Sequence, residues 1–165
     1  MPDTFIKIAS VTVGSGGAAS IDFTSIPSTY TDLVVKGSVR TDAGTAYGVV
    51  YLSVNGVTTN QSRVRIFGDG ASAGTDIDSS QSLALVSGNG ATANTFGTFE
   101  MYIPNYTGSS VKSLSWDSVG ETNATTIYAQ LLAGLWNQTT AITSIGFTAG
   151  FMQYSTATLY GIKNS

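Results

Sequence analysis

Runs in which apolar and polar residues alternate recur along the chain, and clusters of Gly, Asn, Pro and Ser separate them. Alternation with a period of two is typical of a β-strand that buries one face, and turn residues mark where each strand stops. The pattern predicts about ten strands and no helix. The expected strands fall within Phe5–Val13, Ala19–Phe23, Leu33–Arg40, Tyr47–Val54, Val57–Phe67, Leu83–Val86, Phe96–Ile103, Val111–Ser118, Ile127–Trp136, Ile142–Thr148 and Thr156–Ile162.

The connections between these runs differ in kind. Asn55-Gly56 separates two β-rich runs, and this dipeptide favours a type I′ turn because both of its residues tolerate a positive φ. It therefore predicts a tight hairpin between Tyr47–Val54 and Val57–Phe67. The segments without a hydrophobic period are expected to be loops: Gly68–Ser82, Ser87–Thr95 and Gly120–Thr125.

The run Ile127–Trp136 is apolar on both of its faces. Its leucine spacing is compatible with a helix, but the flanking β-branched residues favour a strand. As a strand it would place Ile127 and Leu131 on one face and Leu132 and Trp136 on the other. We therefore expect both faces of this strand to be covered by other parts of the protein.

Short, evenly spaced strands with two long loops are typical of an all-β fold made of two packed sheets. The sequence predicts a single-domain antiparallel β-sandwich over residues 1–165, in the form of a jelly roll. A domain of this length buries about 70% of the surface that its unfolded chain exposes, which is enough for a core without disulfides.

The chain is unusually poor in charge. Charged residues make up 10% of it, against about 25% in average globular proteins, and the net charge is −3. The seven cationic residues are scattered, which argues against a nucleic-acid partner. The most apolar stretch, Tyr128–Trp136, is far shorter than the roughly 20 residues that span a bilayer, so no membrane partner is expected either. A neutral polar surface suits a protein that is packed into an assembly.

The residue types that carry most enzyme chemistry are absent. The chain has no His and no Cys, which removes the commonest general base and the usual transition-metal ligands. Glycoside hydrolysis needs only two carboxylates, and Glu100, Asp117 and Glu121 are the candidates, but their spacing predicts no shared cleft. We expect neither enzymatic activity nor a cofactor.

One Gly-rich segment contains three carboxylates, Asp69, Asp76 and Asp78. Calcium prefers flexible loops rich in oxygen ligands, so these residues are a candidate calcium site. Their spacing does not match the helix-loop-helix calcium pattern, and Asp in loops is equally well explained by Asx turns.

Four residues are candidates for contacts between subunits. Arg63 and Arg65 alternate onto one face of their strand, where they would meet a partner subunit or line a solvated sheet face. Phe5 and Lys7 lie in the N-terminal segment, which is a further candidate contact.

Several aromatic residues could anchor an interface or stack on sugar rings. Tyr106 and Tyr154, in predicted loops, are the candidates for these roles. Trp116 and Trp136 lie on apolar strand faces and are expected to pack in the core.

Three segments carry a resemblance to a known class of protein. They are Ile26-Pro27-Ser28-Thr29-Tyr30-Thr31-Asp32-Leu33, Ala141-Ile142-Thr143-Ser144-Ile145 and Thr158-Leu159-Tyr160-Gly161-Ile162-Lys163. Together with their surroundings they resemble virion proteins of tailed bacteriophages, including those of cyanobacterial and other aquatic phages. The resemblance spans both ends of the chain but not residues 68–95. It implies a β-sandwich that forms trimers or larger rings in the virion, as a head decoration protein or as part of a tail fibre.

The chain has no coiled-coil heptads or shaft repeats, which a free-standing fibre needs. We therefore expect a non-enzymatic capsid decoration or cement protein, made in the host cytoplasm and located in the virion. Its expected partners are itself, as a homotrimer, and the major capsid protein, which it would contact through residues 1–7, 68–82 and 87–95. The alternative is a tail-fibre or receptor-binding module that recognises host surface polysaccharide.

Overall fold

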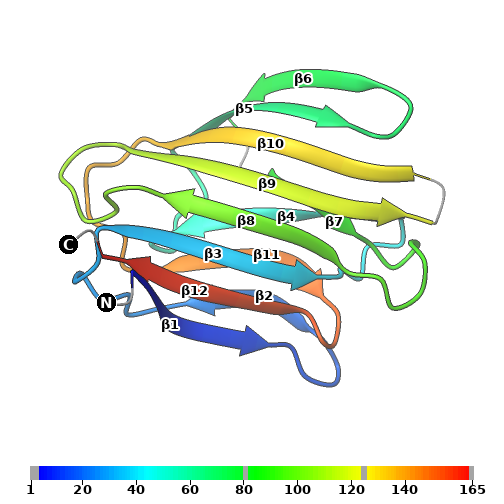
Figure 1. Ribbon diagram of the computed structural model, residues 1–165, viewed down its shortest axis with the longest axis horizontal. Helices are drawn as coiled ribbons and strands as arrows, with labels where there is room; N and C mark the ends of the chain where they lie inside the picture. Colours follow the sequence, from blue (N-terminus) through cyan, green and yellow to red (C-terminus); the bar gives the residue numbers. More distant parts are fainter. Residues whose placement is uncertain (1–3, 80–81, 124–125, 164–165) are drawn as a thin grey trace.

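Two antiparallel sheets packed face to face make up the protein. In the computed structural model, which describes residues 4–79, 82–123 and 126–163, twelve strands form these sheets and no residue is helical, so no helix is long enough to cross a membrane (Figure 1). The larger sheet has the order β1 (Phe5–Thr12), β12 (Thr156–Ile162), β3 (Asp32–Val39), β8 (Gly97–Ile103), β9 (Lys112–Thr122), β10 (Thr126–Trp136), β5 (Gln61–Gly68), β6 (Ala73–Asp78). The smaller sheet has the order β2 (Ala18–Phe23), β11 (Ile145–Phe151), β4 (Tyr47–Val54), β7 (Ser82–Ser87).

The strand pairs nest inside one another along the chain. β1 pairs with β12, β2 with β11, β3 with β8 and β4 with β7, and successive pairs alternate between the two sheets. This winding, in which a ribbon of antiparallel pairs is rolled into two sheets, is that of a jelly roll. The predicted fold class is therefore confirmed.

Two hairpins are added to the jelly roll. The β5–β6 hairpin is inserted between β4 and β7, and the β9–β10 hairpin between β8 and β11. Both join the same sheet and pair with each other through β10 and β5. We call these four strands the hairpin extension; they make one sheet twice as wide as the other, so β5 and β6 extend past β7, the last strand of the smaller sheet (Figure 1).

Inward-facing side chains of both sheets form one apolar core. At its centre the rings of Trp116 and Phe99 stack with their centroids 4.6 Å apart, and Phe147 from the smaller sheet packs against both. Trp116 and Trp136 are buried in this core, as predicted.

Two of the predicted loops contain strand. β6 lies inside the expected loop Gly68–Ser82, and β9 continues to Thr122 in the expected loop Gly120–Thr125, so both predictions are wrong there. β6 lacks an apolar period because it sits at the sheet edge, with Ile77 on one face exposed and Asp76 on the other facing arginines. The expected loop Ser87–Thr95 does connect β7 to β8.

The Asn55-Gly56 turn forms as predicted, but the hairpin around it does not extend. Both residues have a positive φ, and Val54 and Val57 exchange two backbone hydrogen bonds across the turn. Beyond this single pair, β4 stays in the smaller sheet while β5 crosses to the larger one. The turn residues fixed the local geometry, whereas the strand partners were set by the rest of the sheet.

The two sheets come closest where β8 and β9 cross over β7. A Cβ atom added at Gly120 would lie 2.9 Å from the carbonyl carbon of Val86, and one at Gly97 would lie 2.8 Å from the backbone nitrogen of Ser87. These atoms belong to the backbone and cannot swing away. Glycine is therefore required at both positions by close approach of the two sheets.

Gly120→Ala is expected to lower the free energy of unfolding by about 1–3 kcal/mol, because the added methyl group pushes the sheets apart. Urea denaturation followed by tryptophan fluorescence measures this change. Gly44→Ala is the matched control, since a Cβ there meets no atom within 4 Å. Equal stabilities of the two variants would show that the sheets are not in such close contact.

Candidate functional site

The outer face of β10 is apolar and exposed. Leu132 and Trp136 point into the core, and the alternate residues Ile127, Leu131 and Leu135 are 55%, 54% and 36% exposed. The expectation that both faces of this strand are covered is therefore wrong for the outer face within this chain. The polar and charged side chains that normally mark a solvated strand face are missing at Ile127, Ala129, Leu131, Ala133 and Leu135.

Neighbouring strands continue this apolar surface in register. Leu131 lies opposite Ile66 of β5, while Ala133 lies opposite Val64, which in turn lies opposite Ile77 of β6. On the other side, Val119 of β9 lies opposite Ala129. We call this surface, the outer side of the hairpin extension, the apolar face. Among the described residues it contains seven of the thirteen large hydrophobic ones that are exposed: Val64, Ile66, Ile77, Val119, Ile127, Leu131 and Leu135.

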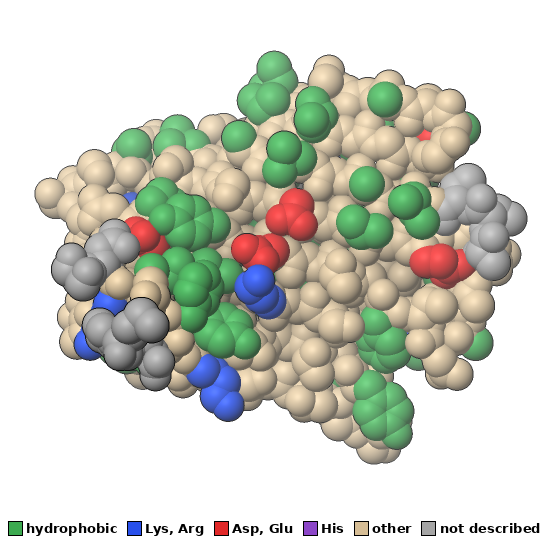
Figure 2. All heavy atoms as spheres, viewed as in Figure 1, with side chains coloured by type: hydrophobic (Ala, Val, Ile, Leu, Met, Phe, Trp, Pro, Cys, Tyr) green, Lys and Arg blue, Asp and Glu red, His purple; other side chains and the backbone are tan. Residues whose placement is uncertain are grey.

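Figure 2 views the larger sheet from this side. Hydrophobic side chains are scattered over the region of β9, β10, β5 and β6 and form a second group toward the left of the sheet. Acidic and basic side chains lie near the middle and the left of the sheet, and one acidic group lies at the right-hand end near β9. The remaining outer surface of the sheet includes an ion pair of 2.7 Å between Lys36 and Glu100 and the exposed ring of Phe5 beside Tyr160.

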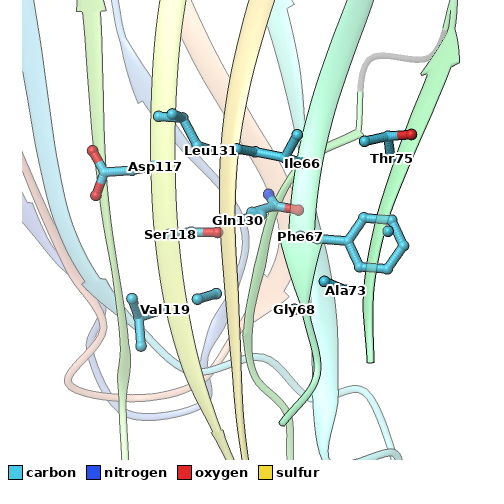
Figure 3. Close-up of a pocket in the computed structure, with 12 residues that line it drawn as sticks. Ile66, Phe67, Gly68, Ala73, Thr75, Asp117, Ser118, Val119, Gln130 and Leu131 are labelled. Carbon is cyan, nitrogen blue, oxygen red and sulfur yellow. The ribbon is translucent and has the colours of Figure 1, made fainter. Parts of the chain in front are cut away.

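The apolar face is hollowed at its centre. A row of small residues, Ala129, Gly68 and Ala73, lies beside the row of larger residues Leu131 and Ile66, and the step between the rows lines an open hollow of about 740 Å³. Figure 3 shows Leu131 and Ile66 on one side of this hollow and Val119, Gly68 and Ala73 on the other. The hollow is open to solvent and can receive an apolar side chain from outside.

Asp117 is the acidic residue at the border of this hollow, opposite Leu131 on one side and Glu100 on the other. Burial by its neighbours raises the pKa of its carboxyl group above the usual value, and the charge of Glu100 raises it further, while Lys36 acts in the opposite direction. The carboxylate is therefore less favoured here than in open solvent.

Arg63 and Arg65 do share one face of β5, but it is the inner face and it is not solvated. Arg63 is only 6% exposed, and the Arg65 guanidinium donates to Asp76 of β6, with ion-pair distances of 2.6 Å for Arg65 and 3.8 Å for Arg63. Arg65 also lies over the ring of Phe67 at 4.7 Å. Both arginines are thus paired within the chain, and their contact with a partner subunit stays a prediction.

The calcium candidates are engaged in separate interactions. Asp69 accepts backbone hydrogen bonds from Ala71 and Ser72, which lower the pKa of its carboxyl group, and this is the Asx-turn alternative. Asp76 is paired with the arginines of β5. Only the backbone of Asp78 is described. Among the described residues, no three carboxylates come together as a metal site.

The two glutamates are also engaged separately. Glu100 pairs with Lys36, and Glu121 accepts hydrogen bonds from Thr92 and Thr95 in the loop between β7 and β8. Each carboxylate thus has its own set of partners.

The aromatic candidates are split between core and surface. Tyr106, predicted as a loop anchor, is completely buried, and its hydroxyl donates to the carbonyl of Pro27, so it can neither stack on a sugar nor anchor a partner. Tyr154 is 68% exposed in the loop after β11. Phe5 is exposed beside Tyr160, with ring centroids 6.2 Å apart, and Lys7 is exposed on the same edge strand, β1.

Comparisons with known proteins give no family. No protein-family model and no curated protein matches the chain. A solved structure of a scytalido-glutamic peptidase with a transition state analog inhibitor is 13% identical over 82% of this chain and 65% of its own, less than two thirds of its length, with a TM-score of 0.32. The CBM2 module of the evolved Dit of Lactobacillus casei BL23 phage J-1 is 13% identical over 94% of this chain and 68% of its own, with a TM-score of 0.21. At such low TM-scores neither likeness indicates a function.

Asp117→Asn is expected to stabilise the protein slightly at pH 7, by at most a few tenths of a kcal/mol because the site is exposed. The raised pKa means that the folded chain binds this proton more tightly than the unfolded chain. The stabilisation that this proton gives to the wild-type protein is complete below the usual Asp pKa, about 4, and is lost as the pH rises through the raised value. The melting temperatures of both proteins at about pH 3.5 and pH 7 measure this; a difference that does not shrink at the lower pH would contradict it.

Proposed function

We propose that this chain is a non-enzymatic structural subunit of a bacteriophage virion, most specifically a capsid decoration protein, and that the apolar face holds it to a second copy of itself. The single observation that carries the proposal is the exposed, nearly uncharged outer side of the hairpin extension. The phage assignment rests on the resemblance of both ends of the sequence to tailed-phage virion proteins. Jelly rolls are common among viral capsid proteins, although lectins share the fold.

The apolar face is large enough for a contact between subunits. From Ile127 to Leu135 it spans about 27 Å, and its four strands span roughly 19 Å, so its area is on the order of 500 Å². The largest apolar patch on an ordinary monomer is about 300–600 Å² and is often functional. Two such faces packed together bury about 1,000 Å², which is the lower limit for a specific interface.

A second copy is the occupant that this surface fits. A flat sheet face packs well on another sheet at about 10 Å, as the two halves of a sandwich do. The acidic residues of this face, Asp117 and Glu121, both lie on β9, and the outer residues described on β10, β5 and β6 are uncharged. Two identical copies that meet through β10, β5 and β6 therefore bring no like charges together. Protruding residues such as Ile77, which is 77% exposed, can enter the hollow between Leu131 and Ala129 of the facing copy.

Leu131→Arg is expected to convert the assembly to monomers without loss of folding, because Leu131 is exposed at the centre of the apolar face. Native mass spectrometry at about 10 μM protein measures this, a concentration at which an interface with a Kd near 1 μM is mostly occupied. Val57→Arg is the matched control, since Val57 is an exposed apolar residue outside the face. A wild-type chain that is monomeric, or a Leu131→Arg variant that still assembles, would refute this contact.

The place in the virion is tested separately. An antibody against this chain, applied to purified particles and imaged by electron microscopy, is expected to label the head. Label confined to the tail would refute the decoration role and favour the receptor-binding alternative.

A further inference from the structure

Four loops meet at the end of the sandwich where β1, β3 and β11 finish. They are residues 13–17, 40–46, 88–96 and 152–155. Backbone hydrogen bonds join them: Met152 N donates to the Arg40 carbonyl at 2.8 Å, Tyr154 N to the Val13 carbonyl at 2.9 Å, and Asn89 N to the Ala43 carbonyl at 2.7 Å. We call this surface the loop end; it lies at the right-hand side of Figure 1, where Thr92 and Thr95 of its 88–96 loop also donate to Glu121 at the end of β9.

Tyr154 is held in a backbone conformation that tyrosine disfavours. Its φ is +72°, whereas every other non-glycine residue with a positive φ among the described residues is Ser25 or an asparagine. Asparagine tolerates this region, but for a bulky residue it is a strained outlier. The Tyr154 ring is also 68% exposed. Glycine would adopt this conformation without strain, so Tyr154 is a candidate for a functional role.

The scaffold fixes this tyrosine firmly. Ser155, completely buried next to it, accepts a hydrogen bond from Arg40 N at 3.0 Å and donates to the Arg40 carbonyl at 3.1 Å. Ser155 N also donates to the Met152 carbonyl at 3.1 Å. Hydrogen bonds of Ser155 to Arg40, next to the end of β3, and to Met152 thus hold the backbone around Tyr154 in place. This pre-organises the Tyr154 ring.

The Tyr154 ring borders a hollow of about 230 Å³ whose lining is neutral and amide-rich. Asn89, Asn94 and Gln153 line it, and within the described part of the chain none of their side-chain amides has a hydrogen-bond partner. Phe96 adds an apolar wall. A second hollow of about 560 Å³ adjoins it and shares Met152 and Gln153.

Arg40, the charged residue in this lining, has no free capacity for an anion. Its Nη1 donates to Thr92 and Thr95 and its Nη2 donates to the carbonyls of Asn89 and Ala91, at 2.7–3.2 Å. The side chain therefore clamps the loop between β7 and β8 from inside. The surface that remains for a ligand is uncharged in the first hollow and carries one acidic residue, Asp42, in the second, which disfavours phosphate, sulfate or sialic acid.

We propose that the loop end binds a neutral saccharide. Sugars present an apolar face of C–H groups and a rim of hydroxyls that both donate and accept. The Tyr154 ring supplies the flat apolar platform, and the amides of Asn89, Asn94 and Gln153 supply paired donors and acceptors. An apolar peptide would leave these amides unpaired, which costs affinity. The two adjoining hollows suit a chain of sugars rather than a single ring.

The test uses the full chain and a glycan array that carries neutral gluco-, manno- and galacto-oligosaccharides beside sialylated and sulfated ones, with calorimetry on the strongest neutral oligosaccharide. Binding to a neutral oligosaccharide is expected, and Tyr154→Ala is expected to weaken it about tenfold or more. Gln153→Ala is expected to weaken it less. Tyr51→Ala is the matched control, because Tyr51 is an exposed tyrosine on β4 that lines neither hollow.

Tyr154→Gly separates binding from folding. Glycine relieves the positive φ, so this variant is expected to keep or raise the melting temperature while it loses the saccharide. No binding to any neutral oligosaccharide at millimolar concentration, binding to acidic glycans only, or binding unchanged in Tyr154→Ala would overturn the proposal. Leu131→Arg, which tests the apolar face, is expected to leave saccharide binding unchanged, so the two proposals can fail independently.

Discussion

The pairing of β10 with β5 is the contact on which the functional surface depends. It joins two hairpins that are inserted at different points of the jelly roll, and it adds four strands to one sheet only. The smaller sheet packs on the inner side of the larger one, and no described part of the chain covers the outer side of these four strands. An outer face built from β10, whose residues are apolar on both sides, then remains exposed. The pairing of the two hairpins is thus what brings the exposed apolar residues of four strands together into one face.

The inner side of β5 and β6, where these strands extend past β7, is polar instead of apolar. Beyond β7, where the smaller sheet no longer supplies apolar partners, the inner residues of β5 and β6 are Arg63, Arg65 and Asp76, and these pair with one another. Gln130 of β10 donates to the carbonyl of Leu83 at the edge of the smaller sheet. Polar groups therefore close the inner side within the chain, while the outer side has been left apolar. This contrast supports a docking role for the outer side, since leaving it exposed has no benefit for the isolated chain.

The sequence predicted the jelly roll because alternation in β8 and β9 marks the inward side chains, such as Phe99 and Trp116, unambiguously. It did not predict the apolar face, because a strand that is apolar on both sides looks the same whether its second side is covered within the chain or by another molecule. It missed β6 because an edge strand with Asp76 on one side and Ile77 on the other has no apolar period. The sequence also did not predict that Tyr106 is buried while Tyr154 is exposed, since the hydroxyl of Tyr106 is bonded to Pro27, 79 positions away.

Two surfaces on one small scaffold can serve two separate interactions. The apolar face lies on the outer side of the larger sheet, the loop end lies where β1, β3 and β11 finish, and the two adjoin at Glu121, which accepts hydrogen bonds from Thr92 and Thr95. The central claim is that the apolar face is covered in the assembled protein. A cryo-electron microscopy map of the assembly at side-chain resolution tests it most directly. The account predicts that Leu131 and Ile66 are buried against a second copy of the chain; a map in which both face solvent would contradict it.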